Sequence, residues 1–248
     1  MKEEEKNFLL FDLDGTLTLP REKIQQDMIE TLLEIKKQDN WQIGIVGGGT
    51  LEHMEDQLGE FIKEIDYIFS ENGTKTLYKN KLIFEEKIKD IIGNEAIKEI
   101  ANFCLKYMSE VELPFKRGTF FELRTGLANI CPMGRNCTYE ERLFFVEYDE
   151  KHKILKKFRD ELDANYSKKY NLVFSLGSSV SIDMFIEGYR KPFCLQFIKN
   201  KDIYFFGDKT SPGGNDYEIS IDNRIKESFT VKNPHDTICL LNKIVFKK

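Results

Sequence analysis

The sequence has few residues of the kinds that build disulfide-bonded folds or zinc sites. Its 248 residues include three histidines and five cysteines, which is an odd number, and no pair of cysteines has the CxxC spacing. A disulfide framework and a zinc site are therefore both disfavoured. We expect the cysteines to be reduced and mostly buried in the core.

Long apolar segments and an excess of positive charge are also missing. No segment approaches the roughly 18 apolar residues of a membrane span, and the charged start Met1–Lys6 cannot form the apolar part of a signal peptide. We therefore expect a cytoplasmic protein with no membrane partner. Lys and Arg number 37 against 42 Asp and Glu, and the formal net charge of -5 does not favour nucleic acid as a partner. Any phosphate site must therefore owe its positive charge to residues at the site itself.

The beginning and the end of the chain share one pattern, an apolar strand that ends in an acidic residue. Strands are predicted at 8–11, 42–46 and 202–207, and the first two are followed by helices at 24–35 and 51–61, where apolar residues lie three or four apart. A last helix is predicted from Asn233, which precedes a proline and can cap it. Strands and helices in alternation indicate an α/β fold with a parallel sheet.

The middle of the chain has a different pattern. After a predicted hairpin of 76–78 and 82–84, helices are predicted at about 94–109 and 150–165, and strands at 118–124, 127–131, 171–176 and 179–185. Strands and helices no longer alternate singly, which indicates an α+β insert on an antiparallel sheet. We therefore predict a parallel α/β core formed by residues 1–81 and 188–248, with residues 82–187 inserted as a cap domain.

Four aspartates follow the predicted strands of this core. Asp12 and Asp14 end the first strand, Asp208 ends a later one, and Asp216 follows in a glycine-rich run. An Asp-x-Asp pair alone could be a surface or capping feature, but two such strand ends at one edge of a parallel sheet indicate a site. Converging carboxylates with no Lys or Arg between them would repel one another unless a hard cation were bound. A magnesium site is therefore predicted.

The same residues fit phosphoryl transfer. A carboxylate such as that of Asp12 can attack a phosphoryl group and form an aspartyl-phosphate, which divides one displacement into two easier steps. Mg²⁺ would offset the repulsion between the two anions. Asp14 is then placed to donate a proton to the departing oxygen and to accept one from the incoming hydroxyl.

Arginines are concentrated in the predicted insert and indicate a second site for phosphate. Arg117, Arg124, Arg135 and Arg142 lie within one short stretch of an acidic protein. Each alone could be a solvated surface residue, but arginine binds phosphate through two hydrogen bonds at once and stays charged. A site that holds one phosphate while another reacts fits a mutase.

Several motifs resemble those of a known enzyme superfamily. The stretch from Asp12 to Thr16, after its apolar strand, resembles the first motif of the haloacid dehalogenase (HAD) superfamily, whose members use the first Asp as nucleophile and the second as acid/base. Other stretches resemble one member family, the eukaryotic-type phosphomannomutases: Phe11–Arg21, Ser70–Gly73, Arg117–Phe120, Pro132–Arg135 and Phe205–Glu218. The likeness covers nearly the whole chain. It departs at Gly49, where Ser is usual, and at Ile225, where Thr is usual.

The resemblance implies roles for residues in both parts of the chain. Asp12 would be the nucleophile and Asp14 the acid/base, and Lys191 would steady the nucleophile and the transferring phosphate. Asp208 would complete the Mg²⁺ site with Asp12 and the backbone carbonyl of Asp14, and Asp222 would contribute to a second cation site. The implied substrate-binding residues are Arg21 in the core and, in the cap, Arg124, Arg135, Arg142, Ser181 and Asp183, of which the last two can face one side of a predicted strand.

The resemblance also implies a reaction. A phosphorylated enzyme would interconvert mannose 6-phosphate and mannose 1-phosphate through a hexose 1,6-bisphosphate, with mannose or glucose 1,6-bisphosphate as activator. It would supply GDP-mannose synthesis and form a homodimer through its cap domains. Closure of the cap would exclude water. Three alternatives stay open: a sugar-phosphate phosphatase of the same superfamily, a mutase that prefers glucose phosphates, and a non-catalytic sugar-phosphate-binding protein, which the aspartates disfavour.

Overall fold

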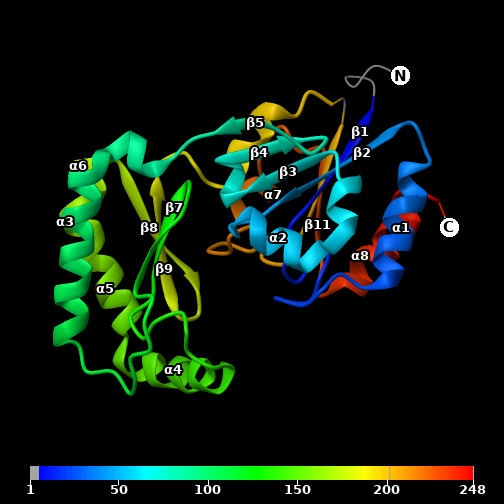
Figure 1. The fold of residues 1–248 in the computed structure, drawn as a ribbon. Coiled ribbons are helices and arrows are strands. Elements are labelled where there is room, and N and C mark those ends of the chain that lie inside the picture. Colours follow the sequence, from blue (N-terminus) through cyan, green and yellow to red (C-terminus); the bar gives the residue numbers. More distant parts are fainter. Residues whose placement is uncertain (1–5, 201, 248) are drawn as a thin grey trace. The chain divides into compact units, whose positions relative to one another are not determined.

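The computed structural model describes residues 6–200 and 202–247, and the chain forms two compact units. The first unit joins Met1–Glu85 to Tyr189–Lys248, and the second is Glu86–Gly188 (Figure 1). Each unit has its own sheet, parallel for the most part in the first and antiparallel in the second. The predicted fold class, a parallel α/β core with an α+β insert, is confirmed.

The first unit is built on a seven-stranded sheet with the order β11-β10-β1-β2-β3-β4-β5. Its parallel strands are β1 (Asn7–Phe11), β2 (Trp41–Val46), β3 (Tyr67–Ser70), β10 (Ile203–Gly207) and β11 (Glu227–Thr230). The predicted hairpin forms as β4 (Lys75–Tyr78) and β5 (Lys81–Glu85), and it adds two antiparallel strands at one edge of this sheet. β1 lies between β10 and β2, so the two parts of the chain meet inside this sheet, where β10 pairs with β1.

Both faces of this sheet are covered. In β1, Leu9 and Phe11 belong to one apolar cluster and Phe8 and Leu10 to another, and all four are fully buried. Burial on both faces explains why β1 is a continuous apolar run instead of an alternating one. The first cluster includes residues of α1 (Gln26–Lys36), α2 (Leu51–Leu58) and α8 (Pro234–Ile244), and the second includes residues of α7 (Tyr217–Ser220) and the 3-10 helix η5 (Lys191–Phe197).

Two elements of the first unit differ from the prediction. The helix predicted at 51–61 ends at Leu58, because Gly59 has a φ of 55°, and Phe61 belongs to the 3-10 helix η2 (Gly59–Glu64). Strand β11 was not predicted at all. It is a four-residue strand at the edge of the sheet, with Glu227 exposed, so it lacks the apolar run that identified β1 and β10. A 3-10 turn, η3 (Glu71–Gly73), follows β3.

The second unit is a four-stranded antiparallel sheet covered by helices. Its strands, in the order β6-β7-β9-β8, are β6 (Phe121–Leu123), β7 (Leu127–Ile130), β9 (Ser181–Ile186) and β8 (Leu172–Ser178). Its helices are α3 (Ile88–Glu110), α4 (Tyr139–His152), α5 (Ile154–Leu162) and α6 (Lys168–Tyr170), and a π-helical turn, η4 (Asp163–Ser167), joins the last two. α3 and α5 lie beside each other along the sheet (Figure 1), where Tyr107 stacks on Phe158 with ring centroids 4.2 Å apart.

The helix predicted near 150–165 corresponds to α5 and η4, whereas α4 was not predicted. α4 carries no apolar stripe, since Phe145 is its one buried residue while Leu143 and Phe144 are exposed. A hydrophobic pattern therefore could not find it. The local signal is a capping box, in which Thr138 and Glu141 bond to each other's backbone N–H groups.

The cysteines agree with what composition led us to expect. All five cysteines are free, and all except Cys239 are buried. Burial raises the pKa of Cys104 to about 12 and that of Cys131 to about 11. Within residues 6–200 and 202–247, no helix combines the length and the hydropathy that a membrane span requires.

Candidate active site

Three carboxylates meet at the carboxyl ends of β1 and β10. Asp12 follows β1 and Asp208 follows β10, and these strands are parallel neighbours in which Phe11 lies opposite Phe206. Asp216 lies in the loop after Asp208. One carboxylate oxygen from each of the three aspartates lies within 4.8 Å of the other two. The structure thus brings together Asp12, Asp208 and Asp216.

Two glycines make this close approach possible. A Cβ at Gly207 would lie 2.7 Å from Oδ2 of Asp216, and one at Gly15 would lie 2.8 Å from Oδ2 of Asp208. Gly15 also has a φ of +86°, a backbone conformation that favours glycine. Both glycines of the motifs around Asp12 and Asp208 are therefore required by the packing of the carboxylates.

A lysine lies among these carboxylates. The pattern of aspartates predicted a cluster without one, whereas the resemblance implied that Lys191 lies beside the nucleophile. The Nζ of Lys191, at the start of η5, lies 2.5 Å from Oδ1 of Asp12 and also contacts Oδ1 of Asp216. Lys191 and Asp216 are fully buried and Asp12 nearly so. The sequence places Lys191 far from both partners, and only the folding of η5 against the sheet brings it in. Its charge offsets part of the repulsion that was expected to require a metal.

The electrostatics of Asp12 reflect this burial. The pKa of Asp12 is raised to about 7, and loss of water is the largest cause. Lys191 opposes the rise, whereas the negative charges of Asp216 and Asp208 add to it. Burial would lower the pKa of Lys191, but the two carboxylates that it contacts raise it above its ordinary value. Lys191 is therefore a cation that holds Asp12 in a buried position.

The carboxylates fit a hard divalent cation even with Lys191 present. Oδ1 of Asp208 is a buried oxygen that accepts no hydrogen bond from the described protein, which is costly unless something else binds there. Burial raises the pKa of Asp208 although the exposed Lys209 opposes that rise, so its charged form would gain from a further partner. Asp216 is different, because Oδ1 contacts Lys191 and Oδ2 accepts the N–H of Lys209 at 3.0 Å. Carboxylate oxygens of this kind suit Mg²⁺.

The side chain of Asp14 lies outside this group of three. Its Oδ1 accepts the backbone N–H of Arg21 at 2.9 Å and the Nε2–H of Gln57 at 2.8 Å, while the residue itself is exposed to solvent. Gln57 is a buried residue of α2 and also donates to Thr18 Oγ1. We did not predict Gln57, although a polar residue beside Met54 and Leu58 on the buried face of a helix was a signal that could have found it.

Asp222 also lies apart from the three clustered carboxylates. Both of its oxygens accept hydrogen bonds from the guanidinium of Arg224, at 2.8 Å from Nε and 2.8 Å from Nη2. This contact lowers the pKa of Asp222. A cation at Asp222 would have to share the carboxylate with Arg224.

The second unit gathers most of the residues expected to bind substrate. Arg124 and Arg135 both contact Oε2 of Glu122, at 2.7 and 2.9 Å. Asn129 donates to Ser181 Oγ at 2.9 Å and to Asp183 Oδ1 at 2.6 Å. Arg135 donates to Asn129 Oδ1 at 3.0 Å, which joins the two groups.

Arg142 reaches the same network through the backbone, because its Nη2–H donates to the carbonyl oxygen of Arg135 at 2.9 Å. Arg117, in contrast, pairs with Glu141 through Nε at 2.8 Å. Burial raises the pKa of Asp183, although its bond from Asn129 and the nearby guanidinium groups oppose that rise. Glu122 and Asn129 were not predicted from the sequence.

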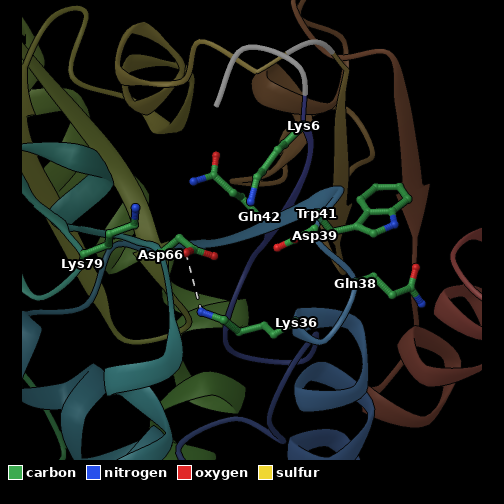
Figure 2. A pocket seen from close by; sticks show the side chains of 8 residues that line it. All are labelled: Lys6, Lys36, Gln38, Asp39, Trp41, Gln42, Asp66 and Lys79. Atoms are coloured by element: carbon green, nitrogen blue, oxygen red, sulfur yellow. Dashed lines mark ion pairs between the residues drawn. The ribbon is translucent and has the colours of Figure 1, made fainter. Parts of the chain in front are cut away.

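A hollow of about 260 Å³ in the first unit is not part of the carboxylate site (Figure 2). Its lining residues include Lys6, Asp39 and Asp66, which precede β1, β2 and β3. Figure 2 shows Lys36 pointing towards Asp66, to which it is ion-paired at 3.5 Å. The hollow therefore lies at the amino ends of the parallel strands, whereas Asp12 and Asp208 lie at the carboxyl ends.

Comparison with solved structures identifies the class of fold. A haloacid dehalogenase-like hydrolase from Bacteroides thetaiotaomicron superposes with a TM-score of 0.64 over 96% of this chain and 99% of that one, at 14% identity. At this identity the likeness shows the fold alone. The fold is that of the HAD class, as predicted.

Sequence comparison narrows the class to one family. The family model described as eukaryotic phosphomannomutase matches residues 28–247. Phosphomannomutase 2 of Dictyostelium discoideum is 42% identical over 252 residues, covering 100% of both chains, and phosphomannomutase of Drosophila melanogaster is 43% identical over 243 residues, covering 96% of this chain and 94% of that one. The chain belongs to the eukaryotic phosphomannomutase family, which confirms the resemblance found in the sequence.

Proposed function

We propose that this enzyme interconverts mannose 6-phosphate and mannose 1-phosphate by moving phosphoryl groups to and from Asp12. The observation that carries the proposal is the buried carboxylate of Asp12, held by Lys191 beside Asp208 and Asp216. Family membership supports the substrate, because the relatives are named as phosphomannomutases.

The proposed reaction has two balanced half-reactions. The phosphoryl group on Asp12 passes to the free hydroxyl of a hexose monophosphate: the new O–P bond forms, the bond from phosphorus to Asp12 breaks, and the hydroxyl proton moves to Asp14. The hexose 1,6-bisphosphate then turns, and its other phosphoryl group returns to Asp12 while Asp14 gives the proton back to the departing oxygen. Mannose or glucose 1,6-bisphosphate serves as activator by phosphorylating Asp12 at the start.

The chain's own residues prepare Asp12 for this role. Lys191 keeps the buried carboxylate in place and compensates its charge. Asp12, Asp208 and the backbone carbonyl of Asp14 would hold Mg²⁺, which when bound supplies positive charge that lets an anionic nucleophile approach an anionic phosphate. Asp216 supports this group by fixing Lys191. A second cation site at Asp222 stays a prediction.

Residues of the second unit would hold the phosphate that is not reacting. We assign this role to Arg124, Arg135 and Arg142, and we assign contacts with phosphate and sugar hydroxyls to Ser181 and Asp183. The side chain of Arg21, in the first unit, is assigned to the ligand as well. Retention of the bisphosphate by these groups is what would separate a mutase from a sugar-phosphate phosphatase of the same class.

We also propose a homodimer formed through the second unit. In α4, Tyr139, Leu143 and Phe144 are exposed by 71%, 51% and 53%, which is unusual for neighbouring large apolar residues and supports burial against a second copy. The enzyme is proposed to work in the cytoplasm and to supply mannose 1-phosphate for GDP-mannose.

The first test is an assay of mannose 1-phosphate and glucose 1-phosphate conversion, with and without Mg²⁺ and a hexose 1,6-bisphosphate. We expect turnover to require both Mg²⁺ and the hexose 1,6-bisphosphate, and we expect EDTA to abolish it. Full activity in demonstrably metal-free protein would contradict the assignment of Asp12 and Asp208 as metal ligands. A preference for glucose 1-phosphate would correct the substrate and leave the mechanism intact.

The second test concerns the arginines. Arg135→Ala and Arg142→Ala should each reduce mutase turnover about ten- to a hundredfold, the effect of losing one charge-assisted hydrogen bond. Hydrolysis of a hexose bisphosphate needs only the first unit and water, so it should fall much less. Arg117→Ala, which breaks the surface pair with Glu141, is the matched control. Unchanged mutase turnover and KM in the Arg135 and Arg142 variants would refute the second phosphate site.

A further inference from the structure

A row of polar residues crosses the sheet of the second unit. Strand pairing places Glu122 of β6 opposite Asn129 of β7, Asn129 opposite Asp183 of β9, and Asp183 opposite Ser175 of β8. Residues that lie directly opposite each other in neighbouring strands point to the same face of a sheet. These four side chains therefore share one face, across strands whose other residues are mostly apolar.

Asn129 is the centre of this row. It is 3% exposed, and three hydrogen bonds satisfy its amide: it donates to Ser181 and to Asp183, and it accepts from Arg135. All three partners are residues that the proposed function assigns to substrate. A buried amide with three defined bonds can hold its partners in only one arrangement.

Glu122 fixes the two guanidinium groups at one end of the row. Its Oε2 accepts from Nε and Nη2 of Arg124, at 3.2 and 2.7 Å, and lies 2.9 Å from Nε of Arg135. A guanidinium carries five N–H donors in a rigid fork. Glu122 therefore holds both arginines by their Nε sides, and the bonds to Glu122 leave three of the five N–H groups of Arg124 uncommitted.

We propose that Glu122, supported by Asn129, is a positioning residue that orients Arg124 and Arg135 for the phosphate that is not reacting. The proposal rests on the proposed function, which assigns the arginines to phosphate. Without Glu122, two long cationic side chains at one site would repel each other and sample many rotamers, and ordering them would weaken binding. A carboxylate between them removes both costs before substrate arrives.

A competing role for Glu122 makes the opposite prediction. If Glu122 only competed with the phosphate for the two arginines, its removal would strengthen phosphate binding. The loss of a negative charge near an anion site would act in the same direction. If Glu122 positions the arginines, its removal weakens binding even though a negative charge is lost. The sign of the change in substrate affinity therefore decides between the two roles.

The experiment compares Glu122→Gln, Glu122→Asp and the control Glu150→Gln, which removes an exposed carboxylate of α4. We expect Glu122→Gln to raise the KM for mannose 1-phosphate about tenfold, the lower end for a charge-assisted bond, with kcat little changed. Glu122→Asp keeps the charge, but its side chain is one methylene shorter and its carboxylate lies farther from the arginines, so the KM of this variant should rise as well. Glu150→Gln should match the wild type, and thermal unfolding of each variant controls for misfolding.

A mutant cycle shows whether Glu122 acts through the arginines. In an Arg124→Ala, Arg135→Ala background, Glu122→Gln should cause no further rise in KM, because its partners are gone. A fall in KM for Glu122→Gln, or an equal rise with and without the arginines, overturns the proposal. An unchanged KM for Glu122→Gln beside a raised KM for Arg135→Ala overturns the positioning role alone. Unchanged KM in the arginine variants themselves would refute the phosphate site and the inference together.

Discussion

Replacing Lys191 by Met tests the electrostatics of the active site most directly. Met is close to Lys in length, so the change removes one buried charge with little loss of volume. Asp12 and Asp216, which are 5% and 0% exposed, would then lack their ammonium partner. Removing one partner of a buried ion pair costs about 3 to 5 kcal/mol of stability, because the remaining charges stay buried and uncompensated.

The expected effect on unfolding follows from this energy. A chain of this size loses about 2 to 4 °C in unfolding midpoint per kcal/mol of lost stability. A loss of about 3 to 5 kcal/mol should therefore lower the midpoint of Lys191→Met, measured in EDTA, by roughly 6 to 20 °C. The loss belongs to the transition of the first unit, which contains all three residues. Mg²⁺ should stabilise the variant more than the wild type, since Lys191 no longer offsets the charge of the carboxylates.

The stability that Lys191→Met loses relative to the wild type should also depend on pH. The pKa of Asp12 is raised from 3.8 to about 7 in the folded protein, so its contribution to stability is fully present below 3.8 and is lost as pH rises through about 7. Loss of Lys191 raises this pKa further, and stability continues to fall at higher pH. The difference in midpoint between wild type and Lys191→Met should therefore be larger at about pH 8.5 than at about pH 6.

Lys209→Met is the matched control for this experiment. Its side chain is 61% exposed, and its Nζ lies 3.7 Å from Asp208, so the same charge is removed beside the same carboxylates but in contact with water. An exposed pair of this kind contributes at most about 1 kcal/mol. If Lys191→Met unfolds at the wild-type temperature in EDTA at both pH values, or if Lys209→Met is equally damaging, the buried lysine does not stabilise the site as argued.

Three further outcomes are expected. Asp12→Asn should abolish turnover and leave folding intact, with Asp56→Asn, an exposed aspartate of α2, as control; near-normal activity would end the aspartyl-phosphate mechanism. Gly134→Ala should unfold at a lower urea concentration than the wild type, since its φ is +90° and a Cβ would lie 2.2 Å from the carbonyl oxygen of Gly118, and an unchanged midpoint would contradict this. A maleimide should label only Cys239 in native protein at neutral pH, because burial raises the pKa of thiols such as Cys104 to about 12; more than one label per chain would disprove their burial.

The sequence predicted the core of the fold because its signals are local. A fully apolar run such as Phe8–Phe11 is typical of a strand buried on both faces, and an acidic residue after it marks the carboxyl end of the strand. Two such strands, β1 and β10, are neighbours, so Asp12 and Asp208 had to meet. α4 and β11 lack such signals, one having no apolar stripe and the other lying exposed at an edge.

Residues that act through other residues were harder to predict, because their partners come from other elements. Lys191 was found only by resemblance, and nothing local to it indicates contact with Asp12 or Asp216. Gln57 bonds to Asp14 from a helix that begins only after the next strand. Each of these contacts depends on how one element packs on another, which hydrophobic periodicity does not specify.

The polar row of the second unit could be predicted from the sequence only in part. Glu122 and Arg124 are two apart in the sequence, so a strand places them on one side, and Asn129 interrupts an otherwise apolar strand. Those facts mark the residues as unusual, but they leave the pairing of the strands open. A shift of one residue in the register of β6 and β7 would turn Glu122 and Asn129 to opposite faces and separate Arg124 and Arg135 from Asp183. The network therefore depends on strand register, and the hydrogen bonds of Asn129 in turn favour that register over its neighbours.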